Sequence, residues 1–380
     1  GALPTRRFEF TIEANDITPT NDRWRIYYPD GQPASYDVYR NGEHVASSDD
    51  ADVLHVTDSY GNVAIYVPQN ETYHFAIVTT AAALKIEYYT ELISNPNKIT
   101  ITRFSEDVDR YEFRILNAHL EVPRTLPEHI RSMYSMFADS NLFNQDLSGW
   151  DVSRITDTQH AFSNCEAFNG DISNWSLDSL TNATKMFYGC KSFNVPIGNW
   201  RTPNLAVAVE MFSDASAFNQ DLSNWDVSNV FTFEHMFSQC YAFNGSLSGW
   251  DITGATTTKG MFSYAHSFNQ DIGMWDTSRL KTMEKMFQEA KAFNQDISMW
   301  DTSSITGTTG MSGMFNYASS FNQDLSSWNV SNVPSKPYIF DSFATSWTLP
   351  RPVWGRDGST LEVDFLKIDL SGASGTILNL

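Results

Sequence analysis

The sequence is poor in basic residues and has no long apolar run. Its 25 lysines and arginines face 45 aspartates and glutamates, which gives a formal net charge of −20 at pH 7. A surface of this sign repels phosphate backbones and anionic lipid headgroups, so nucleic acid is not a predicted partner. No apolar run approaches the roughly 18 residues that a membrane-crossing helix needs, so direct membrane insertion is not predicted.

Motifs of the common catalytic and metal-binding sites are also missing. The eight histidines form no H-x-H or H-E-x-x-H pattern, so no metal centre is predicted from them. No G-x-S-x-G, phosphate-binding or dinucleotide-binding fingerprint occurs, and no residue is predicted to be catalytic. Paired carboxylates can hydrolyse glycosidic bonds, which keeps a polysaccharide-acting enzyme as an alternative function.

Cysteine is scarce, with three residues in the whole chain. Cys165, Cys190 and Cys240 occupy one position of a repeat whose other copies carry alanine or serine. This placement predicts a small buried side chain at which cysteine replaces alanine. A disulfide between Cys165 and Cys190 is the alternative that the sequence leaves open.

Residues 1–125 are predicted to form an all-β sandwich. Short runs in which apolar and polar residues alternate predict about eight strands, and Asn41-Gly42 predicts a tight hairpin turn. The runs include FEFTI (8–12), RWRIYY (23–28), NVAIYV (62–67), YHFAIV (73–78), LKIEYY (84–89), KITITRF (98–104) and YEFRIL (111–116). Many short strands separated by turns are typical of a β-sandwich.

Residues 126–340 repeat a phrase of the form FNQDLSxWDVSxV. Its asparagine recurs at one fixed spacing from Asn144 to Asn294, and once more after a slightly longer interval, at Asn322. A strict period of a few tens of residues predicts a solenoid, here of about eight coils, because one unit cannot bury its apolar side alone. Residues 341–380 depart from the repeat and are predicted to form a C-terminal cap followed by a β tail, LEVDFLKIDL (361–370).

Each repeat unit is predicted to combine a short helix with a short strand. The apolar residues of MFSDASAF (211–218) have the spacing of a two-turn helix. Those of LSNWDVSNV (222–230) follow the L-x-x-L-x-L-x-x pattern of a leucine-rich repeat. The predicted fold is therefore a β-sandwich followed by an α/β leucine-rich-repeat-like solenoid.

The phrase MFxxAxxFNQDLSxWDVSxVT resembles the repeat of BspA-family leucine-rich-repeat surface proteins. That family includes mycoplasma-type lipoproteins and relatives encoded by bacteria and their phages, and a β-sandwich of the PKD or immunoglobulin type often precedes the array. The resemblance implies a protein on a cell or virion surface that binds another molecule. It implies no catalytic residue.

Two polar columns of the repeat are candidates for special roles. One is an asparagine column that never varies, for which we predict a ladder of side chains that hydrogen-bond from coil to coil and to the loop backbone. Its members are Asn144, Asn169, Asn194, Asn219, Asn244, Asn269, Asn294 and Asn322. The other is an aspartate directly after tryptophan, predicted to point outward on the concave face as a ligand-binding column. Its members are Asp151, Asp226, Asp251, Asp276 and Asp301.

Stacked carboxylates repel one another, so the aspartate column needs compensation. Solvent and local backbone donors are one source. Binding of calcium, or of a cationic or hydroxyl-rich ligand, is the other, because carboxylates are hard oxygen donors. No other cofactor is predicted.

These features favour a non-enzymatic binding protein located outside the cell, on a cell surface or on a virion surface. It would act as an adhesin or receptor-binding module whose partner is a protein or a cell-surface glycan. The first alternative is a structural virion component, such as a phage tail or capsid decoration protein, that attaches to other virion or surface subunits. The polysaccharide-acting enzyme is the second.

Overall fold

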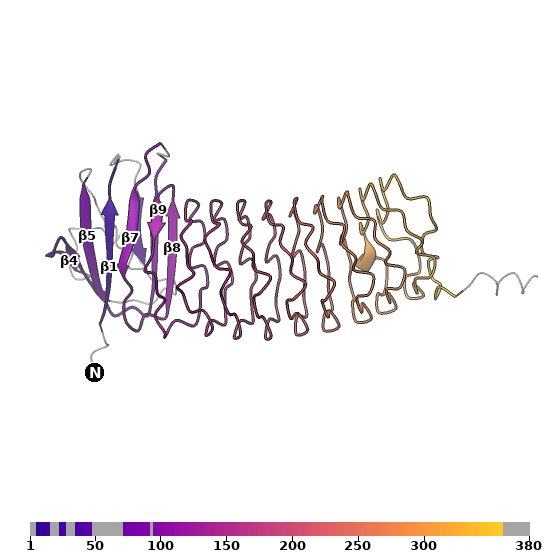
Figure 1. Cartoon of the computed structure of the whole chain (residues 1–380), viewed down its shortest axis with the longest axis horizontal. Coiled ribbons are helices and arrows are strands. Elements are labelled where there is room, and N and C mark those ends of the chain that lie inside the picture. The colour runs from indigo at the N-terminus through magenta and orange to yellow at the C-terminus, as the bar shows by residue number, and fades with distance from the viewer. Residues whose placement is uncertain (1–4, 16–22, 28–34, 48–70, 92–93, 360–380) are drawn as a thin grey trace, which may run out of the picture.

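The computed structural model describes residues 5–15, 23–27, 35–47, 71–91 and 94–359. A β-sheet unit lies at the N-terminal end, and a long stack of coils continues from it (Figure 1). The predicted strand NVAIYV (62–67) and the predicted tail LEVDFLKIDL lie outside the described residues. Within the described residues, no helix has the length and apolar character of a membrane span.

The N-terminal unit contains two sheets. One has the strand order β4-β3-β5-β1-β7-β9 and the other the order β2-β6-β8. The strands are β1 (Arg6–Glu13), β2 (Arg23–Tyr27), β3 (Tyr36–Arg40), β4 (Glu43–Ser47), β5 (Thr72–Thr79), β6 (Ala83–Tyr89), β7 (Lys98–Arg103), β8 (Arg110–Leu116) and β9 (His119–Glu121). Each predicted strand that falls on described residues is confirmed.

Alternating side chains of the two sheets share one core. Phe8 and Phe10 of β1 are buried, and the ring of Phe8 lies 5.5 Å from that of Tyr111 on β8. The sheets therefore pack in a sandwich-like manner. The predicted hairpin joins β3 to β4, and both Asn41 and Gly42 have positive φ, 51° and 84°, as a tight turn of this type requires.

The predicted helix of each repeat is wrong, and with it the α/β solenoid. The described residues contain only one short helical turn, η1 (Thr309–Met311). In residues 211–218, the N–H of Ala215 bonds to Phe212 and that of Phe218 bonds to Ala215, each three residues back. Glu210 and Asp214 have positive φ, 53° and 61°, which a right-handed helix excludes.

The predicted strand of the repeat is also absent. Residues 222–230 form turns, in which the N–H of Trp225 bonds to Leu222 and that of Val230 bonds to Val227. Backbone pairing of the β type between coils is reduced to isolated bridges, such as Val207 with Thr232. Each coil is thus a closed series of tight turns, and the repeat unit holds neither a helix nor a long strand.

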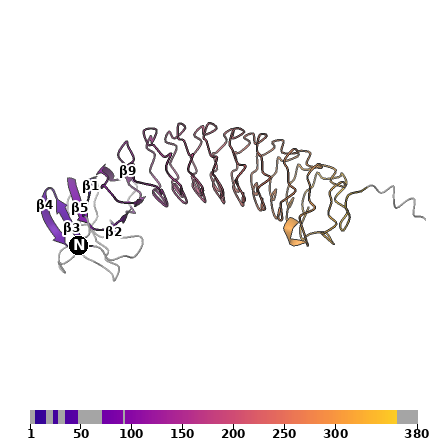
Figure 2. The same ribbon diagram turned by 90° about the horizontal axis from the view of Figure 1, so that it is seen from below.

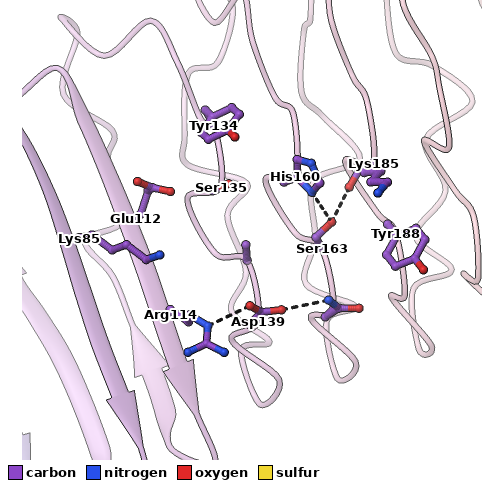
Figure 3. Close-up of a pocket in the computed structure, with 12 residues that line it drawn as sticks. Lys85, Glu112, Arg114, Tyr134, Ser135, Asp139, His160, Ser163, Lys185 and Tyr188 are labelled. Carbon is purple, nitrogen blue, oxygen red and sulfur yellow. Dashed lines mark hydrogen bonds and ion pairs between the residues drawn. The ribbon is translucent and has the colours of Figure 1, made fainter. Parts of the chain in front are cut away.

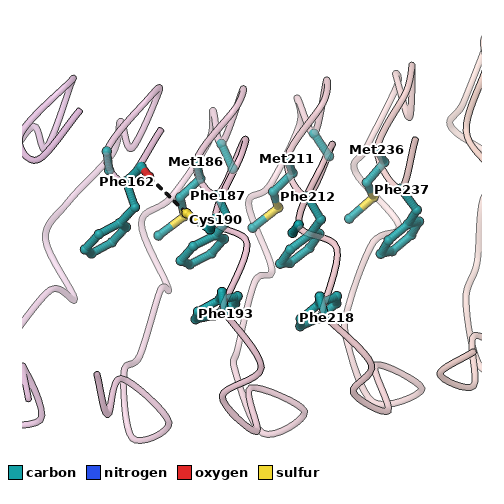
Figure 4. Close-up of a cluster of buried hydrophobic side chains, with 14 of the residues drawn as sticks. Phe162, Met186, Phe187, Cys190, Phe193, Met211, Phe212, Phe218, Met236 and Phe237 are labelled. Atoms are coloured by element: carbon teal, nitrogen blue, oxygen red, sulfur yellow. Dashed lines mark hydrogen bonds between the residues drawn. The ribbon is translucent and has the colours of Figure 1, made fainter. Parts of the chain in front are cut away.

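Columns of aromatic rings form the core of the stack (Figure 4). Phe187, Phe212 and Phe237 follow one another with ring centroids 5.5 and 5.6 Å apart and nearly parallel planes. A second phenylalanine of each coil lies against the first, as Phe218 does at 4.3 Å from Phe212. The tryptophans are buried beside them, since Trp225 is 2% and its successor Trp250 is 4% exposed.

The cysteines belong to this core and form no disulfide. Cys165, Cys190 and Cys240 are free and fully buried. The thiol of Cys190 donates a hydrogen bond to the carbonyl of Phe162 at 2.9 Å (Figure 4). Cys165 makes the same contact with Phe137. Burial raises the pKa of the Cys190 thiol far above its usual range, so it stays protonated.

The sheet unit passes into the stack without a linker. Strand β8 lies along the first coil, where the N–H of Phe113 bonds to the carbonyl of Met136 at 2.6 Å. The ring of Phe113 lies 6.0 Å from Phe137 and so begins the phenylalanine column. One buried apolar cluster therefore runs from Phe8 to Trp347.

The last described coil ends the columns by changing the ring geometry. Trp347 meets Phe315 and Phe321 edge-on, at 5.2 and 4.8 Å. Trp354 meets Phe340 in the same way, at 5.0 Å. Edge-on rings close the apolar end that a further coil would otherwise cover.

The stack bends into a shallow arc, with η1 on its inner side (Figure 2). The N–H of Met283 bonds to the carbonyl of Gly310, just as the N–H of Thr258 bonds to the carbonyl of Thr282 one coil earlier. Gly310 of η1 is therefore the equivalent of Thr282. We call the stretch that follows this position the inner segment. It comprises residues 133–139 and their equivalents in later coils: 158–164, 183–189, 208–214, 233–239, 258–264, 283–289 and 311–317.

Removing one ring from the middle of the phenylalanine column should destabilise the protein strongly. We expect Phe212→Ala to lower the free energy of unfolding by about 3–5 kcal/mol, because the ring is fully buried between two others. Urea unfolding measures the effect. Met274→Ala is the control, since Met274 is 89% exposed and its loss should change little. Equal effects of the two substitutions would contradict this account of the core.

Candidate functional site

The coils combine a constant frame with variable outward side chains. Phe137 and its equivalents occupy one inward column of the inner segment in every coil. Two positions beside this column, represented by Glu210 and Asp214, have positive φ. Side chains at the first of these positions differ from coil to coil: Ser135, His160, Lys185, Glu210, His235, Gly260 and Lys285. The backbone conformation at this position is therefore constant, whereas the type of side chain varies from coil to coil.

A pocket of about 360 Å³ lies where the sheet unit meets the first coils (Figure 3). Side chains from β6 and β8 line one side, and side chains from the first inner segments line the other. The lining residues are Lys85, Glu112, Arg114, Tyr134, Ser135, Ala138, Asp139, His160, Ser163, Asn164, Lys185 and Tyr188. We call this hollow the junction pocket.

The floor of the junction pocket is held by an ion pair that joins the two parts of the protein. Nε of Arg114 on β8 lies 2.9 Å from Oδ2 of Asp139 on the first coil. The other oxygen of Asp139 accepts a hydrogen bond from Nδ2 of Asn164 at 3.0 Å (Figure 3). Strand, first coil and second coil are thereby fixed relative to one another at the pocket.

His160 lies in the middle of the pocket wall. Its Nδ1 lies 3.2 Å from the hydroxyl of Ser163, which in turn donates to the carbonyl of Lys185 at 2.9 Å (Figure 3). Because that hydroxyl uses its proton on Lys185, it accepts from His160. Burial and the nearby Lys185 ammonium lower the pKa of His160, so its ring is neutral at pH 7.

Two tyrosines give the pocket its apolar surface. The ring of Tyr134 lies 6.2 Å from that of His160, and the ammonium of Lys185 lies 5.2 Å from the centre of the Tyr188 ring. Around them are cations, carboxylates, hydroxyls and an amide, so donors and acceptors are mixed. Such a lining suits a ligand that carries many hydroxyl groups and has an apolar face.

The structure places the predicted aspartate column on turns, not on a strand. Asp151, Asp226, Asp251, Asp276 and Asp301 are all exposed. Each carboxylate accepts hydrogen bonds from the residue two positions later, as Asp276 does from the N–H and the hydroxyl of Ser278, at 3.0 and 2.6 Å. Local donors therefore satisfy these charges one by one.

These local bonds also favour the charged form of each carboxylate. The Thr253 hydroxyl and N–H lower the pKa of Asp251, and Ser278 and Ser153 do the same for Asp276 and Asp151. Nowhere in the described chain do three or more histidine, cysteine, aspartate or glutamate side chains gather as metal ligands.

The asparagine column joins the coils through side-chain and backbone groups. The carbonyl oxygen of each side chain accepts the N–H of the next asparagine, as between Asn219 and Asn244 at 2.8 Å. The series runs from Asn144 and Asn169 through Asn194, Asn219, Asn244, Asn269 and Asn294 to Asn322. At its end, Asn322 accepts the N–H groups of Thr348 and Leu349. The bonds lie at the surface and join side-chain carbonyls to backbone N–H groups.

None of the residues proposed from the sequence lines the junction pocket. The aspartate column lies in the turn after tryptophan, and the asparagine column lies after the second phenylalanine of the coil. The pocket residues were missed because they come from two predicted domains. The signal present in the sequence is the variability of the column that contains Ser135, His160 and Lys185 within an otherwise strict repeat.

Comparison with known families gives one result. The family described as "Mycoplasma protein of unknown function, DUF285" matches three times, at residues 116–224, 178–275 and 259–354. The matches together span residues 116–354, which is more than half of the 380 residues. The chain belongs to this family. The similarity to mycoplasma-type repeat proteins noted in the repeat phrase is thus confirmed. No curated protein and no solved structure matched the chain.

Loss of one asparagine from this DUF285 repeat should weaken the contact between two coils. We expect Asn219→Ala to lower the free energy of unfolding by about 1 kcal/mol, since the N–H of Asn244 then has only water as a partner. Thermal unfolding is the measurement, and Asn224→Ala, at an exposed position five residues later, is the control. If both variants melt at the same temperature, the column does not contribute to stability.

Acid should destabilise the repeat through its turn aspartates. The pKa values of these groups are lowered, chiefly by the hydroxyl of the residue two positions later, for Asp146, Asp151, Asp221, Asp251, Asp276, Asp296 and Asp324. A lowered folded-state pKa stabilises the protein above the unfolded value of about 3.9, and this stabilisation is lost as the pH falls further. The melting temperature should therefore be level from about pH 7 to 5 and fall below about pH 4.

The double variant Asp251→Asn, Asp276→Asn should fall less steeply in acid, because it has two fewer such groups to protonate. Glu106→Gln with Glu128→Gln removes two exposed carboxylates outside the repeat phrase and serves as the control. An acid response of the aspartate variant as steep as that of the wild type would show that these turns do not set the pH dependence.

Proposed function

We propose that the protein is a non-enzymatic binding protein that acts outside the cell, on a cell surface or on a virion, and that its ligand occupies the junction pocket. The observation that carries this proposal is the pocket itself, a hollow of about 360 Å³ built by both parts of the chain. The Arg114–Asp139 ion pair and the shared aromatic core hold its walls rigid. Rigid walls favour affinity because little freedom is lost on binding.

The ligand that fits this pocket best is a glycan. Sugar rings present apolar faces, which pack on aromatic rings such as those of Tyr134 and Tyr188, and hydroxyl groups, which need both donors and acceptors. Lys85, Arg114 and Asn164 supply donors, and Glu112 and Asp139 supply acceptors. A protein receptor is the alternative ligand within the same function.

A structural role on a virion or cell surface is a second candidate. The continuous core from Phe8 to Trp347 favours it, because a stack bonded from end to end makes a stiff spacer. A spacer needs attachment at its ends and no ligand in the pocket. Binding of a glycan to the pocket therefore separates the two candidates.

A glycan array probed with the full-length protein tests the proposal. We expect selective binding to some glycans, and an about tenfold weaker signal for the Tyr134→Ala, Tyr188→Ala variant, because two aromatic contacts are lost. Tyr264→Ala is the matched control, since Tyr264 is an exposed tyrosine on a later inner segment, away from the pocket. No binding by the wild type, or equal loss in both variants, would refute a glycan site in the pocket.

A further inference from the structure

Hydrogen bonds between the inner segments share one direction along the stack. Between two central coils, the N–H groups of Ala208, Glu210, Phe212 and Asp214 bond to the carbonyls of residues 232, 234, 236 and 238 in the next coil, at 3.3, 2.8, 2.9 and 2.8 Å. The same kind of row recurs between other pairs of coils, for example from His160 and Phe162 to residues 184 and 186. In these rows the N–H groups point toward the C-terminal end and the carbonyls toward the N-terminal end.

This polarity makes the two ends of the stack chemically different. At the N-terminal end the outward row consists of carbonyls, and β8 covers it with the Phe113 N–H bonded to Met136. At the C-terminal end the outward row consists of N–H groups. The last internal row runs from Gly313, Phe315 and Tyr317 to the carbonyls of residues 338, 340 and 342, at 2.9, 2.8 and 2.8 Å.

The next row of donors belongs to Ile339, Asp341 and Phe343. Within the described chain, none of these three N–H groups has a hydrogen-bond acceptor. Ile339 and Phe343 have positive φ, 45° and 62°, as the equivalent residues of earlier coils do. The terminal coil therefore keeps the conformation that directs its donors outward, even with a β-branched residue at a position where such a φ is strained.

The surroundings of this row are apolar and contain two cations that share one carboxylate. Tyr338 is 77% and Phe343 is 63% exposed, and the ring of Phe343 is stacked on Tyr317 at 4.5 Å. Lys336 and Arg351 lie at the same end, where both contact the carboxylate of Asp341, at 2.6 and 3.0 Å. On a chain with a net charge of −20, this end combines cations with the positive ends of aligned peptide groups.

We propose that this C-terminal edge binds an extended, acidic segment of a partner protein, whose carbonyl oxygens accept the N–H groups of Ile339, Asp341 and Phe343. The three donors belong to alternate residues. The carbonyls of residues 338, 340 and 342, which accept the N–H groups of the preceding coil, have the same spacing. A polypeptide backbone provides acceptors at this spacing, whereas one small anion reaches only one or two of them. Acidic side chains would meet Lys336 and Arg351, and apolar ones would meet Tyr338 and Phe343.

A second copy of the chain is a poor occupant by the same reasoning. Its C-terminal edge also presents N–H groups, so two such edges do not complement each other. Strand β8 lies against the carbonyl row of its first coil, where the Phe113 N–H bonds to Met136. Head-to-tail stacking of copies through these rows would require β8 to be displaced, which favours a different chain as the partner.

The test uses the full-length protein and two labelled synthetic decapeptides. One alternates valine with glutamate and the other alternates valine with lysine. Fluorescence anisotropy measures binding, and amide hydrogen exchange measures protection of Ile339, Asp341 and Phe343, with Gly313, Phe315 and Tyr317 as internal references. We expect the three edge amides to exchange at least about tenfold faster than the references in the free protein, and to be slowed by the glutamate peptide only.

Two variants identify the contact. Asp341→Pro removes one N–H of the row and should weaken binding of the glutamate peptide about tenfold, whereas Asp341→Asn keeps that N–H and should stay within about threefold. Phe343→Gly keeps the N–H and suits the positive φ but removes the ring, so it should weaken binding even if Asp341→Pro does not fold. Tyr134→Ala, Tyr188→Ala should bind the peptide as the wild type does, which separates this edge from the junction pocket.

Three results would overturn the proposal. Edge amides that are already protected in the free chain at all concentrations would show that the chain covers its own edge. Protection that grows with protein concentration would show a second copy instead. Absence of glutamate-peptide binding, or equal binding by wild type, Asp341→Pro and Phe343→Gly, would show that the row is not a binding edge.

Discussion

The stack depends on one constraint, the single direction of the hydrogen bonds between inner segments. Two positions per coil with positive φ turn alternate N–H groups toward the following coil, and each finds a carbonyl there at about the ordinary hydrogen-bond distance. Because the bonds leave the coil, its remaining N–H groups close tight turns within the coil. The coil therefore has neither a helix nor a strand, although nearly every inward residue is buried.

The aromatic core follows from the same constraint. Hydrogen bonds fix the distance between coils, and the ring columns adopt it, with Phe212 and Phe237 centred 5.6 Å apart and nearly parallel. A ring that faces another ring of the next coil needs a small neighbour beside it, which explains alanine, serine or cysteine at the position of Cys190. The thiols at this position also reach a backbone carbonyl of the preceding coil, as Cys190 reaches Phe162, and the hydroxyl of Ser140 reaches the carbonyl of Phe113 on β8. Packing and hydrogen bonding thus favour the same few residue types.

The sequence was sufficient for strands β1 to β8 of the N-terminal unit, although not for β9, and for the position of the repeat and the burial of its apolar residues. It was misleading about the backbone of the coil, because turns that close every three residues place apolar side chains at nearly the same spacing as an α-helix. A partial sign was present in Asp139, Asn164, Gly189 and Asp214, since asparagine, aspartate and glycine tolerate positive φ, but later coils carry Gln239, Tyr264, Glu289 and Tyr317 at the same position. The junction pocket could not be predicted, because it depends on β8 lying along the first coil, and that contact joins Arg114 to Asp139 across an assumed domain boundary.

The aspartates that follow tryptophan already accept hydrogen bonds from nearby residues, which makes them poor candidates for binding a ligand. A carboxylate that already accepts the N–H and hydroxyl of the residue two positions later, as Asp276 does, has to give up or share these bonds to hold a cation. Such carboxylates stabilise their own turns and are less available to bind a ligand. Two other places offer groups for binding. At the positive-φ column beside the junction pocket, the backbone conformation is fixed while the side chain varies from coil to coil. At the C-terminal edge, the direction of the N–H groups is fixed but the described chain provides no acceptor for them. Both places exist because the hydrogen bonds between coils have one direction, and neither involves the recurring residues of FNQDLSxWDVSxV.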